Sequence, residues 1–210
     1  MSRFARDGRT VSRSWAVRHW VAARIGNTRH ERRVAAISVA LVKVLSPFHC
    51  LTRSDIRLLR LAAMVHDVGR CISDKHHPIV GARMILENSA LPLKKRERRA
   101  LAYLTLHHRG QERDARGDAV LRPRDDASRL LILLAFLRAA DALDSRSLPA
   151  PRLQISRRGR RLRIACRLRE ESDKARRAFS RRKKFRLLEK ILNCRVEVSI
   201  EVRRRLRLVA

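Results

Sequence analysis

The sequence has 210 residues, of which 45% are hydrophobic, and a formal net charge of +31 from 51 Lys and Arg against 20 Asp and Glu. A chain this apolar is not a disordered basic tail, and its length suffices for one substantial core or for a main domain with a small appendage. The charge favours polyanionic partners, namely nucleotides, polyphosphate or nucleic acid, although any single arginine could equally lie on a solvated face.

The four cysteines, at positions 50, 71, 166 and 194, form no CxxC pair. This spacing predicts reduced thiols and argues against a zinc knuckle or a disulfide framework. The first residues lead into no long apolar run, and the apolar stretches 34–45 and 130–137 are too short or too interrupted by charge to span a bilayer. We therefore predict a cytoplasmic protein without a membrane partner. An Arg-rich transit peptide is the less favoured alternative, and a homodimer is compatible with the sequence.

A series of helices is predicted up to about residue 148, after a basic and disordered segment at 1–14. Segments with helical patterns follow at 15–25, 29–46, 53–68, from about Pro78 onward, at 94–108 and at 126–144. Gly26-Asn27 and Pro47 supply helix stops, and Thr52 or Ser54 can cap the third helix. Residues 109–125 carry the turn formers and charges of a loop, and 126–144 is the most apolar helix of all.

The pattern changes after Leu148-Pro149-Ala150-Pro151. Residues 152–156 and 161–168 resemble two strands joined by a turn at Gly159, 172–192 one basic helix, and 194–202 a half-buried strand. The predicted fold is therefore mainly α. A helical domain at 15–148 is followed by a small, basic α+β subdomain at 149–210 with the order β-β-α-β.

Candidate metal ligands stand out on the apolar helices. His66 and Asp67 end one such helix, where two polar groups need partners and a metal ion can supply them. Asp141 interrupts the most apolar helix and has the same need, which Arg138 could also meet. His30 opens a helix and is either a ligand or a surface histidine. Asp144 is a rival to Asp141 that more simply caps or pairs locally.

Further histidines could add a second metal ion. The candidates are His77, His107 and His108, for which solvent exposure is an equal alternative. His and carboxylate ligands together suit manganese, iron, nickel, cobalt or zinc, while carboxylate and water would suit magnesium. We therefore predict a divalent metal cofactor.

These residues resemble a known signature. The order H…HD…D, at His30, His66, Asp67 and Asp141, resembles that of the HD superfamily of metal-dependent phosphohydrolases, which implies an HD-domain helical bundle. The segment from His77-Pro78 to Leu86 resembles the HP-x-x-G-x-x-(I/L)L segment of many HD enzymes. The GYP triplet of one HD branch is absent, so cleavage of cyclic dinucleotides is not expected.

A second resemblance covers residues 18–200. The segments VAARIGNTRHERRVAAISVAL, LLRLAAMVHDVGRCIS, RALAYLTLHHRG and RLLILLAFLRAADALDSRS are similar to the C-terminal HD-like region of the exopolyphosphatase/guanosine-pentaphosphate phosphohydrolase (Ppx/GppA) family. The chain has no counterpart of the Gly-rich phosphate loops in that family's actin-like N-terminal domains. The resemblance therefore implies that the chain binds a polyanion, but it does not imply exopolyphosphatase activity.

Basic residues near the proposed ligands and in the tail are candidates for substrate binding. They are Arg70, Lys75, Arg109, Arg157, Arg158, Arg160, Arg161, Arg181, Arg182, Lys183 and Lys184. Few aromatic residues lie among them, so contact with phosphates fits better than base stacking.

The sequence thus predicts a metal-dependent phosphohydrolase with His66 and Asp67 at its catalytic centre. Its substrate would be a nucleotide, alarmone, oligonucleotide or polyphosphate. The alternative is a non-catalytic module that binds polyphosphate or nucleic acid.

Overall fold

The computed structural model describes residues 12–110, 118–170 and 172–202, and it confirms a mainly α fold with a small α+β part at the C-terminal end. The helices of the first part are α1 (Arg13–Ile25), α2 (Arg29–Val44), α3 (Arg53–Val65), α4 (His77–Glu87), α5 (Lys95–His107) and α6 (Ala127–Ala142). Short 3-10 helices lie at Ser46–Phe48 (η1) and Val68–Cys71 (η2). The predicted N-terminal segment 1–14 falls almost wholly outside the described residues, as do residues 111–117 of the predicted loop.

Helix starts follow the capping chemistry of the sequence. Thr52 and not Ser54 caps α3, in a capping box in which Asp55 bonds back to the Thr52 backbone. Asp126 accepts a hydrogen bond from the amide of Arg129 and so starts α6. The predicted helix at 53–68 ends earlier, at Val65, and the chain then turns through η2.

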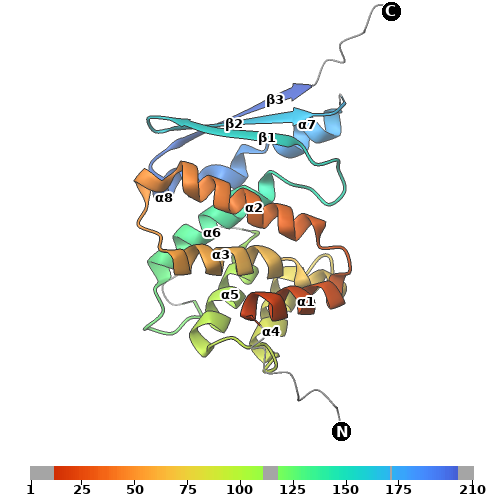
Figure 1. Cartoon of the computed structure of the whole chain (residues 1–210), viewed down its shortest axis with the longest axis vertical. Helices are drawn as coiled ribbons and strands as arrows, with labels where there is room; N and C mark the ends of the chain where they lie inside the picture. Colours follow the sequence, from red (N-terminus) through yellow and green to blue (C-terminus); the bar gives the residue numbers. More distant parts are fainter. Residues whose placement is uncertain (1–11, 111–117, 171, 203–210) are drawn as a thin grey trace, which may run out of the picture.

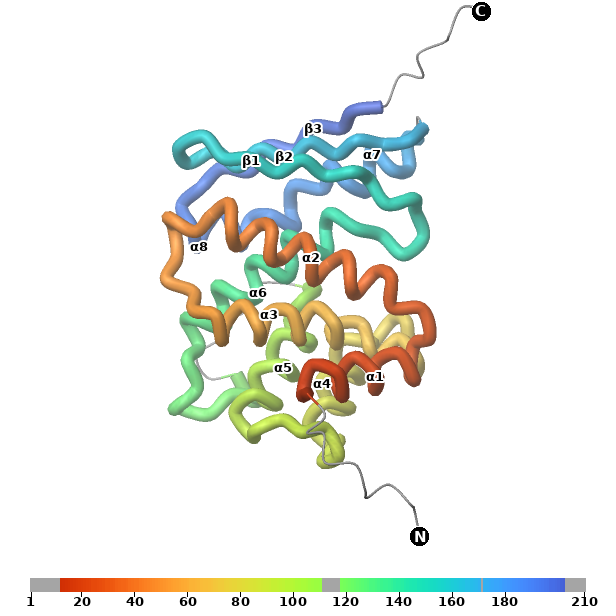
Figure 2. The backbone as a smooth tube through the Cα atoms, viewed as in Figure 1, coloured from red at the N-terminus to blue at the C-terminus, as the bar shows by residue number. Residues whose placement is uncertain are grey.

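The most apolar helix, α6, lies at the centre of the molecule (Figure 2). It contacts α2, α3 and α5 of the bundle, and also the 3-10 helix η3 (Arg182–Phe185) and helix α8 (Arg186–Leu192) of the C-terminal part. Leu133, Phe136 and Leu137 are fully buried there. Burial on all sides explains why this helix has apolar residues all around and no polar face.

The C-terminal part contains β1 (Arg152–Arg158), β2 (Arg161–Leu168), α7 (Asp173–Phe179), η3 (Arg182–Phe185), α8 (Arg186–Leu192) and β3 (Arg195–Val202). The predicted boundary at residues 148–149 falls in the connection between α6 and β1. The strand order is β1-β2-β3, with β1 antiparallel and β3 parallel to the central β2. The sheet forms one end of the molecule, and β1 contacts α2 of the bundle (Figure 1).

The prediction of one helix over 172–192 was wrong in detail. Helix α7 stops at Phe179, Arg181 has a non-helical backbone with φ −67° and ψ 89°, and the chain resumes with η3 and α8. Phe179 and Phe185 are both 1% exposed. Six residues of a continuous α-helix turn through about 600°, which would point these two rings in different directions. The break lets both rings reach the core.

Within the described residues, no helix combines the length and the apolar character needed to cross a membrane.

Candidate metal centre

Five helix ends bring the candidate ligands together at one pole of the bundle, where α2 begins and α3 ends (at the right in Figure 1). His30 lies in the first turn of α2, and His66 and Asp67 directly follow α3. The remaining three lie at the start of α4, the end of α5 and the end of α6: His77, His108 and Asp141. Residues separated by more than 100 positions thus meet in one small volume.

Two glycines allow this close approach. A Cβ atom at Gly69, in η2, would lie 2.3 Å from the carbonyl oxygen of His77 and 2.5 Å from the amide nitrogen of Gly81. Both are backbone atoms, so no side chain could move aside. Gly81 in turn faces the side chain of Thr105 on α5. The missing side chains let η2 and α4 touch, which places His77 beside Asp67.

One group of possible ligands consists of His30, His66 and Asp141, all buried. The Nε2 atom of His30 lies 3.3 Å from Asp141 Oδ1, and that of His66 lies 3.6 Å from the same oxygen. Two imidazole nitrogens and a carboxylate oxygen converging in this way are a donor set suited to a divalent transition metal.

A second group shares His66 and adds Asp67 and His108. Asp67 Oδ1 lies 3.4 Å from His108 Nε2, 3.8 Å from His66 Nε2 and 3.1 Å from His77 Nε2. The Nε2 atoms of His77 and His108 lie only 3.3 Å apart. Asp67 also approaches His30, with Oδ2 at 3.8 Å from Nε2, and so adjoins both groups.

The imidazole rings are held by their other nitrogen. His66, His77 and His108 each donate from Nδ1 to the carbonyl three residues earlier, over 2.8, 2.7 and 2.7 Å. His30 uses Nδ1 for a 2.9 Å hydrogen bond to Asp144 Oδ2. Donation from Nδ1 leaves the lone pair of a neutral ring on Nε2, so all four lone pairs point into the cluster.

Buried polar atoms without a hydrogen-bond partner support the same interpretation. Among the described residues, such atoms include His30 Nε2, His66 Nε2 and Asp67 Oδ1. The second polar atom of each of these side chains does form a hydrogen bond. Leaving buried polar atoms unpaired is costly, and native structures do so only with a reason. The residues present therefore fit a bound divalent cation.

Burial and mutual attraction shift the pKa values of the carboxylates and histidines in the cluster. Burial is the strongest influence on the pKa of His66 and lowers it, but Asp67 and Asp141 outweigh burial, so that the pKa is raised. Burial would raise the pKa of Asp67 and Asp141, yet the surrounding histidines hold both below the usual range. Burial lowers the pKa of His108 to about 4, so this ring is neutral at pH 7.

Three cations contact the outer oxygens of the two carboxylates. Arg70 Nε and Arg146 Nε lie 2.8 and 2.9 Å from Asp67 Oδ2. Lys184 Nζ, from η3 of the C-terminal part, lies 3.2 Å from Asp141 Oδ2. The inner oxygens thus face the histidines, while the outer oxygens face a positively charged opening.

That opening is a cavity of about 300 Å³. Of the predicted substrate-binding residues it is lined by Arg70, Arg109, Arg181 and Lys184. Lys75 is exposed and does not line it.

The hairpin arginines lie elsewhere. Arg157 donates to the carbonyl of Val44, at the opposite end of α2 from His30, and the guanidinium groups of Arg157 and Arg160 stack on Phe48. A 16-residue helix is about 24 Å long, so this basic hairpin, which includes Arg158 and Arg161, is remote from the cluster. The structure also does not place Arg182 and Lys183 in the cavity lining; Arg182 pairs with Glu189, and Lys183 is exposed.

His107 is not brought to the cluster. Its Nε2 atom lies 2.6 Å from Asp118 Oδ2, and its ring packs against Tyr103. Consecutive helical residues point about 100° apart, so only one of His107 and His108 can face the centre. The structure brings His108 into the cluster and places His107 beside Asp118 instead.

Sequence reasoning missed two residues that shape the site, Glu31 and Arg146, and expected a different role for Asp144. Asp144 orients His30 and also accepts a 2.7 Å hydrogen bond from Arg33 Nε, whereas a local cap or pair was expected. Glu31 is fully buried and forms an ion pair with Arg146. Glu31 follows the first candidate ligand, and a carboxylate on the apolar side of a helix is the one signal that could have drawn attention to it.

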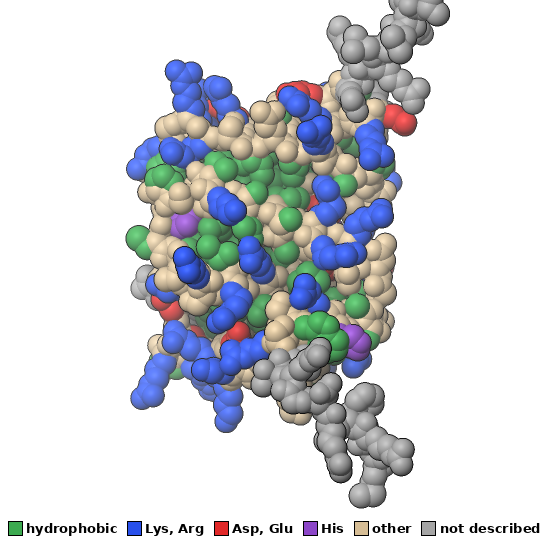
Figure 3. Space-filling view, viewed as in Figure 1, with side chains coloured by type: hydrophobic (Ala, Val, Ile, Leu, Met, Phe, Trp, Pro, Cys, Tyr) green, Lys and Arg blue, Asp and Glu red, His purple; other side chains and the backbone are tan. Residues whose placement is uncertain are grey.

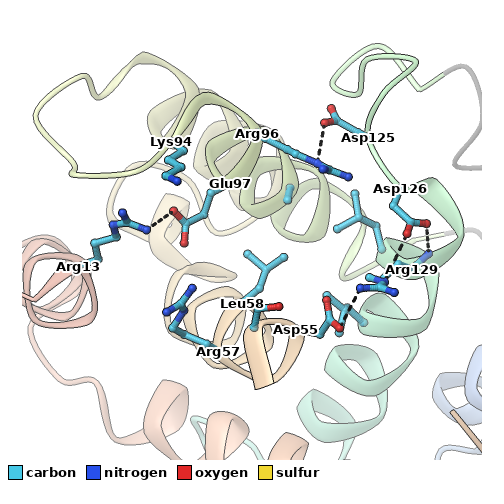
Figure 4. Close-up of a pocket in the computed structure, with 14 residues that line it drawn as sticks. Arg13, Asp55, Arg57, Leu58, Lys94, Arg96, Glu97, Asp125, Asp126 and Arg129 are labelled. Atoms are coloured by element: carbon cyan, nitrogen blue, oxygen red, sulfur yellow. Dashed lines mark hydrogen bonds and ion pairs between the residues drawn. The ribbon is translucent and has the colours of Figure 1, made fainter. Parts of the chain in front are cut away.

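A cavity of about 340 Å³ lies at the start of α3, the opposite end from the cluster (Figure 4). Its rim alternates acidic and basic side chains. Arg129 lies 3.3 Å from Asp55, Arg96 lies 3.6 Å from Asp125, and Arg13 lies 3.6 Å from Glu97. Acids in first helical turns compensate helix dipoles, so this rim has a structural explanation.

Comparison with known proteins agrees with the resemblance found in the sequence. A family model described as Ppx/GppA phosphatase, domain III, matches residues 17–158, which run from α1 to the end of β1. The matched range includes every candidate metal ligand of the cluster, while Lys184 lies outside it. The tail beyond residue 158 lies outside the matched range. No curated protein gave a significant match. Because the matched range exceeds half of the sequence, the chain belongs to the Ppx/GppA phosphatase domain III family.

Proposed function

We propose that this protein is a cytoplasmic, HD-type metal-dependent phosphohydrolase that acts on a phosphate ester or anhydride of a polyanionic substrate. The observation that carries the proposal is the convergence of imidazole Nε2 and carboxylate atoms from five helix ends, directly beneath a cation-lined cavity. Three of these atoms, in His30, His66 and Asp67, have no hydrogen-bond partner. Family membership agrees with phosphate chemistry. The free cysteines fit a reducing compartment.

His30, His66, Asp67 and Asp141 would hold a first divalent ion, and His77 and His108 would help hold a second beside Asp67. The donor set suits manganese, iron, nickel, cobalt or zinc. A bound divalent ion supplies two effects: it lowers the pKa of a water molecule and neutralises charge on phosphoryl oxygens.

The remaining side chains bind and orient the substrate. Arg70, Arg146 and Lys184 already lie within hydrogen-bond distance of the ligand carboxylates, so a phosphate entering the cavity meets three cations without further rearrangement of the backbone. Guanidinium groups suit the paired oxygens of a phosphate. Arg109 and Arg181 line the same cavity and would hold a second phosphate.

A non-catalytic polyanion-binding module is the second candidate. The basic hairpin favours it, because Arg157, Arg158, Arg160 and Arg161 gather far from the cluster and would contact phosphates without any role in hydrolysis. Affinity that falls with salt is expected under both functions, so salt dependence does not separate them.

Metal content does separate them. We expect near-stoichiometric manganese, iron, nickel, cobalt or zinc by elemental analysis of protein purified without chelator, and its loss in Asp67→Ala. Asp173→Ala, at an exposed carboxylate in α7, is the matched control and should keep the metal. Hydrolysis of bis(p-nitrophenyl) phosphate should disappear in Asp67→Ala, while binding of a polyanion to the basic hairpin persists. A protein that holds no metal and takes up none on titration would be a binding module.

A further inference from the structure

The cavity at the start of α3 has an apolar floor beneath its charged rim. Leu58 of α3, Ala100 of α5, and Leu130 and Leu133 of α6 line it. Ala100, Leu130 and Leu133 are at most 6% exposed and belong to the hydrophobic core, while Leu58 packs against that core. A floor supplied by three packed helices is fixed in shape. Its volume of about 340 Å³ is enough for a small molecule, because ligand pockets begin at roughly 300 Å³.

The acids of the rim are already balanced by cations. Each acidic side chain that lines the cavity lies within ion-pair distance of at least one arginine, so none is left to attract a cationic ligand. The pairs are Asp55 and Asp126 with Arg129, Asp125 with Arg96 and Arg99, and Glu97 with Arg13.

Two cations of the lining have no such partner. They are Arg57 of α3 and Lys94, which directly precedes α5. Within the part of the chain that the structure describes, neither side chain forms a hydrogen bond or an ion pair. Both are exposed, so each is available to a molecule that enters from solvent.

These two cations lie on the same side of the cavity, around Glu97 (Figure 4). Lys94 precedes Glu97 by three residues, a spacing that brings side chains together at a helix start. Arg57 and Glu97, together with Arg13, also line an adjoining cavity of about 320 Å³. This side therefore carries three cations against one acid, next to an apolar floor.

We propose that the cavity binds an amphiphilic organic anion, a molecule with one carboxylate and an apolar body. The carboxylate faces Arg57 and Lys94, and the apolar body covers Leu58 and Leu130. Burial of the apolar body supplies affinity, and the two cations select the sign of the charge. Helix α3 has 13 residues and is about 20 Å long, so this site is remote from His66 and Asp67, which follow its other end, and it does not depend on the proposed hydrolysis.

Three probes test the site on the full chain by isothermal titration calorimetry. Octanoate has the chain and the negative charge, octylammonium has the same chain with the opposite charge, and acetate has the charge without the chain. We expect octanoate to bind at least about tenfold more tightly than acetate, because each buried CH₂ group contributes about 0.8 kcal/mol. Octylammonium should not bind detectably.

A pair of double variants locates the binding. Arg57→Gln with Lys94→Gln should weaken octanoate binding by about tenfold, since each exposed ion pair contributes up to about fivefold. Lys43→Gln with Arg83→Gln is the matched control, because it removes one Lys and one Arg at exposed positions outside the cavity lining. It should bind octanoate as the wild type does. All these positions are exposed, so both variants should keep the wild-type circular dichroism spectrum.

Several results would overturn the proposal. Octanoate that binds equally to the wild type and to the Arg57 and Lys94 variant would lie elsewhere, for example at the metal centre. An equal loss in the control variant would mean that only the net charge matters. Binding of octylammonium as tight as that of octanoate, or no binding of octanoate to the wild type, would likewise show that the cavity takes no organic anion.

Discussion

Gly69 offers a direct test of how the candidate metal centre is assembled. In Gly69→Ala, the new Cβ atom would lie 2.3 Å from the His77 carbonyl oxygen, whereas ordinary contacts begin at 3.4 Å. Helix α4 must therefore retreat from η2 by about 1 Å. His77 is the first residue of α4, and its Nε2 atom lies 3.1 Å from Asp67 Oδ1, so the same movement separates two candidate ligands.

Overpacking of this kind costs about 1–3 kcal/mol in the free energy of unfolding. We also expect the metal affinity to fall by about tenfold or more, as when a supporting contact of a metal site is lost. Urea denaturation of the metal-free protein measures the first effect, and titration with Zn²⁺ against a chelating indicator measures the second. The midpoint should fall at an unchanged slope.

Gly81→Ala is the matched comparison. Its Cβ atom would meet Thr105 Cγ2 at 3.0 Å and the Gly69 nitrogen at 3.2 Å, which asks for movements of a few tenths of an ångström. A helical Gly→Ala change also gains about 0.5–1 kcal/mol, so this variant should be near neutral. Equal stability and equal metal affinity in Gly69→Ala, Gly81→Ala and the wild type would refute the reasoning.

Three further predictions follow from other contacts. Asp144→Asn should weaken metal binding by about 10- to 100-fold because His30 loses a charged acceptor; an unchanged affinity in the same titration would contradict this role. Arg99 lowers the pKa of Asp125, so their ion pair stabilises the fold above about pH 4 and loses this effect as the pH falls through the folded-state pKa. Asp125→Asn should therefore lower the urea midpoint at pH 7 and much less at pH 3, and an equal loss at both would be inconsistent. Arg158→Ala should reduce the salt slope of polyanion binding by about one while metal content stays unchanged; a loss of metal would show that the hairpin and the cluster are not independent.

Some site residues could be predicted from the sequence because they are charged residues in apolar segments. Asp67 follows an apolar helix and Asp141 lies within one, and an ionisable group that is buried at such a position needs a partner. The structure places both in the cluster. The choice between His107 and His108 could not be made in the same way, because the two are neighbours and the orientation of α5 decides which ring points inward.

Other contacts depend on packing between distant segments. Arg146 lies more than 70 residues from Asp67 in the sequence and still forms an ion pair with it. No local sequence pattern predicts such a pair. The break at Ser180 has a similar origin. Residues 172–192 have a basic composition compatible with one helix, but the core requires both Phe179 and Phe185 and therefore overrides local preference.

The Nδ1 tethers of His66, His77 and His108 have a consequence for metal choice. Each ring is fixed by its own helix end, through a carbonyl only three residues away, so its rotational freedom is lost during folding and not when an ion arrives. Rings that cannot swing also cannot follow an ion of unsuitable radius. Discrimination among divalent ions would then come from the spacing of rigid donors, set by helix packing, more than from the intrinsic affinity order of the metals.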